Sequence, residues 1–470
     1  MKPAIPTSQR PAVAAGALPA TIFLVQFLVA LDVSLVNIAL PDVQTDLGFG
    51  DAGLQWVVSA YLLTFAGFML IGGRLGDLWG RRSVVLIGLS LFAAASVLGG
   101  FAWDPASLLI ARGIQGLAGA LLAPAALALV TTLPEGKSRS RAMGFWGAAG
   151  AGGGAVGVVL SGLLTDAFSW RAVMFVNLPI VVIALIATWL AVDVEAPRAV
   201  SPRLDVLGAC LATAGVGVLV YAVTAAGEDG WGSTIALGGF AAAAVLLAAF
   251  VGVEARTDQP LMPLHLFRRR SIVGANVFGF MLAAGQLAAF YFASLYIQNV
   301  WGVSTKVAGF MFLPFCGFVV VGIVIATKMA ASIGPRSTLA VLGLVGAAGL
   351  AGFSLMPAET AFWTGVLLPS VLGGIGIGGS MVVLGAAATS GVDAADAGVA
   401  SGVLNASRQL GGTIGLAVLV TIAASATASS DAETAALAAR GGYATGLAVG
   451  ALFLVVGALA AYIIIPRNRK

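Results

Sequence analysis

Long apolar runs, separated by short polar connectors, recur along the whole chain. A helix needs about 20 apolar residues to cross the hydrocarbon core of a bilayer, and most of the runs approach that length. The pattern predicts an all-α polytopic membrane protein with fourteen spanning helices. We expect these helices near residues 17–40, 53–73, 83–102, 106–131, 142–164, 172–192, 204–225, 233–253, 272–298, 305–327, 337–356, 362–388, 398–424 and 443–465.

The composition supports a membrane protein, because 59% of the residues are hydrophobic and 9% are charged, against roughly 25% charged in soluble domains. The 63 glycines suit helices that approach closely in lipid. Cys210 and Cys316 lie in apolar runs without metal-ligand spacing, and the single histidine, His265, lies in a polar connector. We therefore expect no metal, no cofactor and no disulfide framework, and a lipid bilayer rather than nucleic acid as partner.

The basic residues are distributed unevenly between the two predicted faces of the membrane. With the N-terminus placed inside, cytoplasmic segments contain 19 of the 24 lysines and arginines, and external segments contain Arg171, Lys306 and Arg440. An excess of basic residues marks the cytoplasmic face. The distribution predicts that both termini are cytoplasmic.

Two polar connectors that contain proline, 193–203 and 254–271, divide the chain. They predict an N-terminal six-helix half over residues 1–192 and a C-terminal six-helix half over residues 272–470. Between these halves we expect an insert of two helices with flanking connectors, over residues 193–271.

The two predicted halves share a weak repeat. The loop GGRLGDLWGRR at 72–82 aligns with ATKMAASIGPR at 326–336, so that Gly80 matches Gly334, each two residues before an arginine. Parallel halves of a transporter leave repeats of this kind. A Gly-x-Arg turn after a helix is also common by itself, so the topology has to support the match.

Asp32 is a carboxylate inside the first apolar run, and Arg112 is a guanidinium inside the fourth. A charged side chain at the bilayer centre costs roughly 2.5–3.5 kcal/mol to insert. Counting the helix rise gives both residues a similar depth, so we expect their charged groups to lie close together. A carboxylate balanced between burial and a nearby cation can bind and release a proton. A purely structural ion pair is the alternative.

Four motifs resemble those of the major facilitator superfamily, in particular its fourteen-helix drug:proton antiporters. They are LDVSLVNIALP at 31–41, GRLGDLWGRR at 73–82, ARGIQGLAGALLAP at 111–124 and GGAVGVVLSG at 153–162. Together they cover the first, fourth and fifth helices and the loop after the second. Three positions depart from the pattern: Val158 replaces the usual proline, Ser161 the usual glycine and Ser34 a frequent threonine.

The resemblance implies the superfamily fold, two six-helix halves with two extra central helices, and it implies proton coupling by Asp32 and Arg112 in helices that line a central cavity. It also implies a cytoplasmic gate motif, formed by Gly73, Gly76, Asp77, Gly80, Arg81 and Arg82. Lastly, it implies an antiporter-motif helix that carries Gly153, Gly157 and Gly162. An ordinary solvated loop and simple helix packing are the alternatives for these two motifs.

Polar and aromatic side chains in the predicted spans are candidates for cavity lining, although most aromatics in a helix bundle serve packing. They are Asn37, Tyr61, Phe65, Gln115, Trp146, Gln286, Tyr291, Asn405, Arg408 and Gln409. Arg408 differs from Arg112 because no acid lies in a span of the second half. Backbone carbonyls and an anionic substrate group are its alternative partners.

The expected function is proton-coupled export of lipophilic, cationic drugs or natural products by alternating access, carried out by a monomer in a bacterial plasma membrane. A proton-coupled importer of a small nutrient is the alternative on the same fold. An ATP-driven pump is disfavoured, because PEGKS at 134–138 lacks the leading glycine of a P-loop and no strand precedes it. No nucleophile or metal constellation supports an enzyme.

Overall fold

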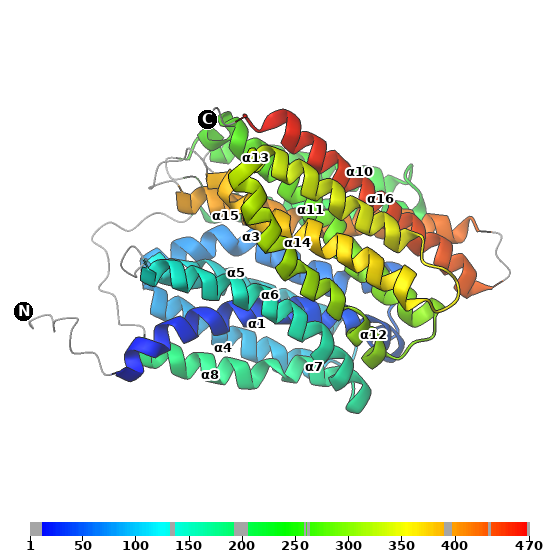
Figure 1. Ribbon diagram of the computed structural model, residues 1–470, viewed down its shortest axis with the longest axis horizontal. Helices are drawn as coiled ribbons and strands as arrows, with labels where there is room; N and C mark the ends of the chain where they lie inside the picture. The colour runs from blue at the N-terminus through cyan, green and yellow to red at the C-terminus, as the bar shows by residue number, and fades with distance from the viewer. Residues whose placement is uncertain are drawn as a thin grey trace, which may run out of the picture.

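The computed structural model describes residues 12–131, 137–191, 205–257, 260, 264–389, 397–430 and 434–467. Every regular element in this described part is a helix. Most helices run roughly parallel to one long axis, so that the molecule is a single layered bundle (Figure 1). The start of the first described helix and the end of the last lie at the same end of that bundle (Figure 1).

The helices of the first half occupy the lower part of Figure 1, in blue to green. α1 packs against α6, and α5 packs against both α3 and α4. The helices are α1 (Ala12–Leu47), α2 (Asp51–Leu54), α3 (Trp56–Trp79), α4 (Arg81–Gly100), α5 (Pro105–Thr131), α6 (Lys137–Ala167), α7 (Arg171–Phe175) and α8 (Asn177–Ala191).

The remaining helices lie mostly in the upper part of the same view (Figure 1). α11 packs against both α15 and α16, and α13 packs along α14. Two short π-helical segments, η3 and η4, and one 3₁₀ turn, η2, interrupt the connections. The elements are α9 (Val206–Asp229), α10 (Thr234–Glu254), η2 (Leu264–Arg268), α11 (Arg270–Leu295), η3 (Tyr296–Val300), α12 (Thr305–Met311), α13 (Leu313–Ser354), η4 (Phe362–Leu367), α14 (Leu368–Thr389), α15 (Ala397–Ala428) and α16 (Ala435–Ile464).

Each predicted apolar run falls on helical residues. The two runs predicted at 305–327 and 337–356 lie in the consecutive helices α12 and α13. α13 is broken at Gly334, whose backbone has φ 79° and ψ 162°. Pro335 follows and has no N–H to donate to a continuing helix. The two predicted spans are therefore two arms that meet at Gly334.

Gly80, the sequence counterpart of Gly334, has nearly the same backbone conformation. Its φ is 83° and its ψ is 143°, and it separates α3 from α4. A positive φ in this region favours glycine, because any Cβ would meet the neighbouring backbone. The weak repeat in the sequence thus corresponds to the same backbone turn, which occurs once in each half.

α9 contacts both halves. The amide of Gln55, just before α3, donates to Thr224 Oγ1 on α9 over 3.0 Å. The hydroxyl of Thr421 on α15 donates to the carbonyl of Val223 on α9 over 3.2 Å. α9 therefore lies beside α3 and α15 and bridges the edge between them.

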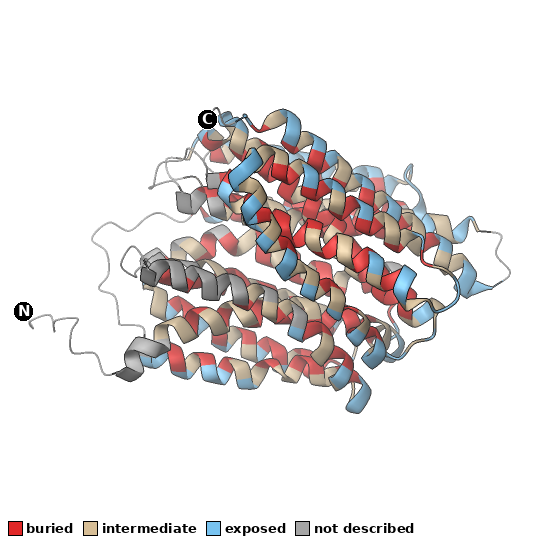
Figure 2. Ribbon diagram, viewed as in Figure 1, coloured by how far each residue is buried: buried red, intermediate tan, exposed pale blue. Residues whose placement is uncertain are grey.

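The outward faces of the bundle are apolar. Ile186 and Trp189 on α8, Val245 on α10 and Ile463 on α16 are all more than half exposed, and Figure 2 shows exposed residues along the outer turns of the helices. An apolar surface of this extent is stable in lipid rather than in water. In the described part, eleven helices are long and apolar enough to cross a membrane.

Glycines let helices of the second half touch backbone to backbone. A Cβ built on Gly376 of α14 would lie 2.1 Å from the Gly346 nitrogen of α13, and one on Gly349 would lie 2.3 Å from the Gly373 nitrogen. Small residues permit such approach in membranes, where dispersion contacts replace the hydrophobic effect between helices. The α13–α14 pair depends on these glycines.

We expect Gly376→Ala to destabilise the protein by about 1–3 kcal/mol, because the new methyl group has to push two backbones apart. The measurement is the melting temperature of the purified protein in detergent. Gly317→Ala on α13 is the matched control, since a Cβ there meets no atom within 4 Å. Equal melting temperatures for the two variants would contradict the packing argument.

Candidate functional site

Asp32 on α1 and Arg112 on α5 form a fully buried ion pair. Arg112 Nη1 donates to Asp32 Oδ2 over 2.6 Å, and the two side chains are 1% and 0% exposed. The contact predicted from their depth is therefore present. A buried pair is stable only when its remaining hydrogen-bonding groups are also satisfied.

Two amides complete the surroundings of the carboxylate. Asn177 Nδ2, at the start of α8, donates to Asp32 Oδ1 over 2.9 Å, and Gln115 Nε2 donates to the same oxygen over 3.3 Å. Both side chains are completely buried. Asp32 therefore accepts three hydrogen bonds from two helices, two from α5 and one from α8.

The guanidinium of Arg112 is held independently of Asp32. Its Nε donates to the Val57 carbonyl of α3 over 3.0 Å, and its Nη1 also donates to Gln115 Oε1 over 2.8 Å. Its central carbon lies 4.6 Å from the centre of the Tyr61 ring, a cation–π contact. The orientation of Arg112 is therefore fixed by α3 and Gln115 as well as by Asp32.

Two polar atoms next to the ion pair have unused hydrogen-bonding capacity. Among the described residues, Tyr61 Oη and Asn177 Oδ1 are buried without a partner. Unsatisfied buried groups are few in folded proteins and often mark a functional site. Both atoms belong to side chains that contact the ion pair, Tyr61 through its ring on Arg112 and Asn177 through its Nδ2 on Asp32.

Three of the residues predicted to line a cavity lie in or beside this cluster. Gln115 also donates to Ser96 Oγ of α4 over 3.0 Å, and the Tyr61 and Phe65 rings stack with centres 5.7 Å apart. All three predicted residues, Tyr61, Phe65 and Gln115, are buried. The site lies inside the first half, enclosed by α1, α3, α4, α5 and α8.

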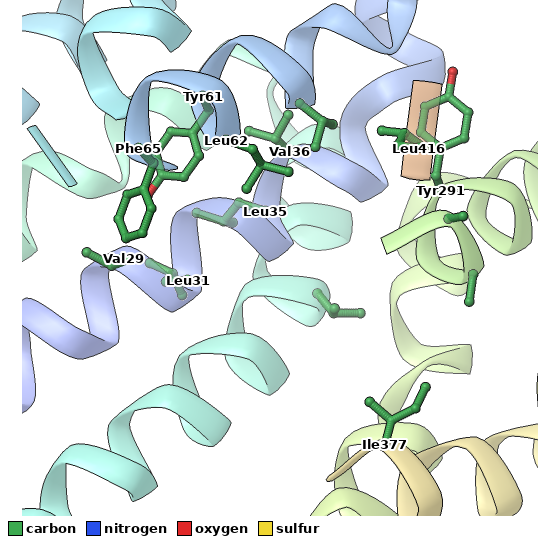
Figure 3. Close-up of a cluster of buried hydrophobic side chains, with 14 of the residues drawn as sticks. Val29, Leu31, Leu35, Val36, Tyr61, Leu62, Phe65, Tyr291, Ile377 and Leu416 are labelled. Atoms are coloured by element: carbon green, nitrogen blue, oxygen red, sulfur yellow. The ribbon is translucent and has the colours of Figure 1, made fainter. Parts of the chain in front are cut away.

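Asn37 and Tyr291 lie where the halves meet. The Asn37 carbonyl of α1 accepts a hydrogen bond from Ser294 Oγ of α11 over 3.3 Å. Tyr291 is buried and packs edge-to-face on Phe292. Figure 3 shows the apolar residues around this region, with Leu35 and Val36 from α1 on one side and Tyr291 and Leu416 from the second half on the other.

Polar contacts close one end of the boundary between the halves. Thr305 Oγ1 lies 2.8 Å from Asp42 Oδ2 and 3.0 Å from Gln298 Oε1, so its proton can be given to either oxygen. Lys306 Nζ lies 4.0 Å from Asp166 Oδ2. These contacts join the C-terminal ends of α1 and α6 to η3 and the start of α12, far from the Gly80 turn.

The glycines of the antiporter-motif helix are packing positions in α6. A Cβ on Gly153 would lie 2.6 Å from the Phe27 carbonyl, and one on Gly157 would lie 2.8 Å from the Leu31 carbonyl, both on α1. Gly162 faces α12 instead, and a Cβ built on it would lie 2.7 Å from the Thr305 carbonyl oxygen. Ser161, which replaces a family glycine, donates to the Leu35 carbonyl over 2.5 Å.

The structure describes only part of the predicted gate motif. Gly76 is buried, Gly80 forms the turn, and Arg81 and Arg82 are partly exposed at the start of α4. A Cβ on Gly73 would lie 3.7 Å from Pro124 of α5. The side chain of Asp77 lies outside the described residues, as does that of Trp146, so their roles stay predictions.

The polar candidates of the second half lie on two neighbouring helices. Asn405, Arg408 and Gln409 are partly buried on α15, and Gln286 is partly buried on α11. Arg408 Nε is buried without a hydrogen-bond partner among the described residues. The first half thus contains a paired arginine and the second half an unpaired one.

Comparison with known proteins assigns the family. The sequence profile of the Major Facilitator Superfamily matches residues 22–416. The chain belongs to the Major Facilitator Superfamily. It is therefore a multi-pass membrane transporter of the bacterial plasma membrane, and not an enzyme.

Several curated members of the superfamily are similar over most of their length. The cephamycin export protein CmcT of Amycolatopsis lactamdurans is 42% identical over 418 residues, 87% of this chain and 85% of that protein. The puromycin resistance protein pur8 of Streptomyces alboniger is 38% identical over 437 residues, covering 92% and 86%. The tetracenomycin C resistance and export protein of Streptomyces glaucescens is 35% identical over 405 residues, covering 85% and 74%.

Solved structures of the superfamily share the fold at low identity. A bacterial homologue of the human lysosomal transporter Spinster, in an inward-facing and unoccupied conformation, aligns with a TM-score of 0.68 at 16% identity, and 97% of each chain is covered. An auto-inhibited peptide transporter of the POT family aligns with a TM-score of 0.69 at 15% identity. These likenesses support the all-helical superfamily fold.

Two members of the buried cluster escaped the sequence analysis, Asn177 and Ser96. Asn177 could have been found, because it is one of few polar residues in the apolar run at 172–192. Ser96 gives no such signal, since serine in a transmembrane helix commonly bonds to its own backbone. Only the packing of α4 against α5 brings it to Gln115.

Charge balance should control the stability of this transporter. Asp32→Asn leaves a buried guanidinium unpaired, and we expect it to lower the free energy of unfolding by about 3–5 kcal/mol. The double variant Asp32→Asn/Arg112→Gln removes both charges and should lose less than Asp32→Asn alone. Thermal melting of the wild type and the two variants in detergent measures this, and a double variant that loses more stability than Asp32→Asn alone would contradict an interacting pair.

Proposed function

We propose that the protein is a proton-coupled antiporter that exports lipophilic compounds by alternating access. The observation that carries this proposal is the buried carboxylate of Asp32, held by Arg112, Asn177 and Gln115 inside the first half. A carboxylate within a membrane span is by default a candidate for proton transfer. Arginine stays charged, so only the acid of the pair can titrate.

In the proposed cycle, α1 links the proton site at Asp32 to the end of the boundary between the halves where Asp42 contacts Thr305. Asp32 and Asp42 lie ten residues apart on this helix, about 15 Å by helix rise. When Asp32 takes a proton its attraction to Arg112 weakens, while Arg112 stays on Val57 and Gln115. α1 is then free to shift against α5. The same shift would disturb the contacts that Asn37 and Asp42 make with the second half.

Fourteen spanning helices and cytoplasmic termini are part of the proposal. The 50-residue stretch Thr305–Ser354 contains the break at Gly334 and supplies two spans. With the other long apolar helices and the shorter helices Trp56–Met69 and Gly152–Ala167, the total becomes fourteen. An even number agrees with both ends of the described chain lying at one end of the bundle.

Export is supported by the relatives, whose names describe export of cephamycin and tetracenomycin C and resistance to puromycin. This favours export over nutrient import on the same fold. Three donors already bind the oxygens of Asp32, so this acid gives no support to the positive charge expected on the substrate. We therefore propose a lipophilic substrate, carried by a monomer without a cofactor, and require no positive charge.

A pH gradient should drive transport without ATP. In liposomes, the purified protein should move a lipophilic dye against its gradient when a pH difference is imposed, and a protonophore should stop it. The Asp32→Asn/Arg112→Gln variant should lose the response to pH and keep exchange of labelled for unlabelled dye. Uphill movement that survives the protonophore would refute proton coupling.

Opening of the boundary near α12 should be required for turnover. In a protein whose Cys210 and Cys316 are replaced by serine, Asp166→Cys/Lys306→Cys should be joined by a short thiol cross-linker, because the native side chains lie 4.0 Å apart. We expect cross-linking to reduce export at least about tenfold. A reducible linker restores activity on reduction, and Asp166→Cys alone is the control. Full activity of the cross-linked protein would contradict alternating access at this end.

A further inference from the structure

Arg408 is positioned by apolar contacts of its aliphatic side-chain carbons, not by polar contacts of its guanidinium. It lies eleven residues into α15, about 16 Å along the helix. A Cβ on Gly279 of α11 would lie 3.1 Å from Arg408 Cγ and 3.2 Å from Leu384 Cδ2 of α14. The side chain therefore passes between α11 and α14. Its Nε is buried there without a hydrogen-bond partner among the described residues.

The described helices of the second half offer this guanidinium no acid. The described helices α11 to α16 contain no aspartate or glutamate. The contrast with Arg112 is direct, because that side chain donates to Asp32, Gln115 and the Val57 carbonyl. Arg408 is only partly exposed, and a guanidinium whose buried Nε has no acceptor is unfavourable in a membrane protein. An arrangement of this kind is stable when a negatively charged group arrives from outside the chain.

Neighbouring amides extend the polar patch along one side of α15. Asn405 lies one turn before Arg408, and Gln409 follows it, both partly buried. One turn further, a Cβ on Gly412 would lie 3.6 Å from Leu62 Cδ1 of α3 and 3.4 Å from Leu287 Cδ2 of α11. The side of α15 that carries the patch therefore meets α3 of the first half one turn further along.

The neighbouring polar side chains of this region, in contrast, are satisfied. Ser407 Oγ donates to Asn276 Oδ1 of α11 over 2.7 Å, and Asn276 Nδ2 donates to the Ile272 carbonyl over 2.8 Å. Thr413 Oγ1 donates to the Gln409 carbonyl over 3.0 Å. These polar side chains thus bond to each other or to the backbone, and none of them bonds to the Arg408 guanidinium or to the Asn405 and Gln409 amides.

We propose that Arg408, assisted by Asn405 and Gln409, binds the carboxylate of a lipophilic organic acid, which is a substrate of the transporter. This rests on the proposed transport function and adds the chemical class of the substrate. The planar guanidinium fork matches two carboxylate oxygens, and such charge-assisted bonds are stronger than neutral ones. The apolar residues beside α15 suit the rest of such a molecule.

Binding of a matched acid and ester tests the site. Purified protein in an uncharged detergent is titrated with dansylaminoundecanoic acid and with its methyl ester, and Kd is read from dansyl fluorescence. The wild type should bind the acid at least about tenfold more tightly than the ester. Arg408→Gln should lose that preference, and Arg408→Lys should retain part of it. The exposed Arg256→Gln is the control, because it removes the same charge far from the patch.

Three results would overturn the proposal: equal affinity of the wild type for acid and ester, an unchanged preference in a folded Arg408→Gln protein, or an Arg408-dependent site occupied by lysophosphatidylglycerol but not by the dansyl acid. The last would make the ligand a lipid headgroup. Melting temperatures establish that the variants are folded. If Arg408→Gln does not fold, the acid-over-ester preference of Arg408→Lys decides the test.

A transport experiment separates this inference from the proposed function. In liposomes with an imposed pH difference, Arg408→Gln should still export the ester and should export the acid at least about tenfold more slowly than the wild type does. Loss of pH-driven transport in the wild type would refute proton coupling and leave anion binding in detergent intact. Export of the acid at the wild-type rate by Arg408→Gln would refute the anion site alone.

Discussion

The free energy of holding one carboxylate inside a membrane span constrains most of the first half. Asp32 can be buried only because Arg112 supplies the opposite charge and two amides supply further donors. Those partners come from α5 and α8, and Arg112 is itself held by α3. A single acid thus fixes how four helices pack. Any change in its protonation has to alter the contacts that all four helices make.

Glycine provides the second constraint, because close glycine contacts transmit a movement of α1 to the neighbouring helices. α6 contacts the backbone of α1 at Gly153 and Gly157 and the backbone of α12 at Gly162. Contacts between backbones are short and cannot be adjusted by side-chain rotation, so a shift of α1 relative to α5 has to move α6 or break these contacts. The closed end near Thr305 is joined to the ion pair through rigid elements rather than through a chain of flexible side chains.

The two halves share a backbone plan and differ in charge. Gly80 and Gly334 make the same turn between corresponding helices. The first half contains an arginine whose acceptors all come from the chain, and the second contains Arg408, for which the described helices supply none. This difference in charge is the basis for assigning the proton to the first half and the proposed anionic ligand to the second.

The sequence by itself determined the helices, the break at Gly334 and the meeting of Asp32 with Arg112, because hydropathy, backbone stereochemistry and the cost of a lone buried charge all act locally or at a depth that can be counted. Only the tertiary structure decided that Tyr61 and Gln115 contact this pair, and that Asn177 and Ser96 join it. Depth along a helix can be read from spacing, but the direction in which a side chain points depends on the rotation of each helix against its neighbours. That rotation is set by contacts between residues far apart in the chain, such as those of Gly153 with α1, which no local pattern records.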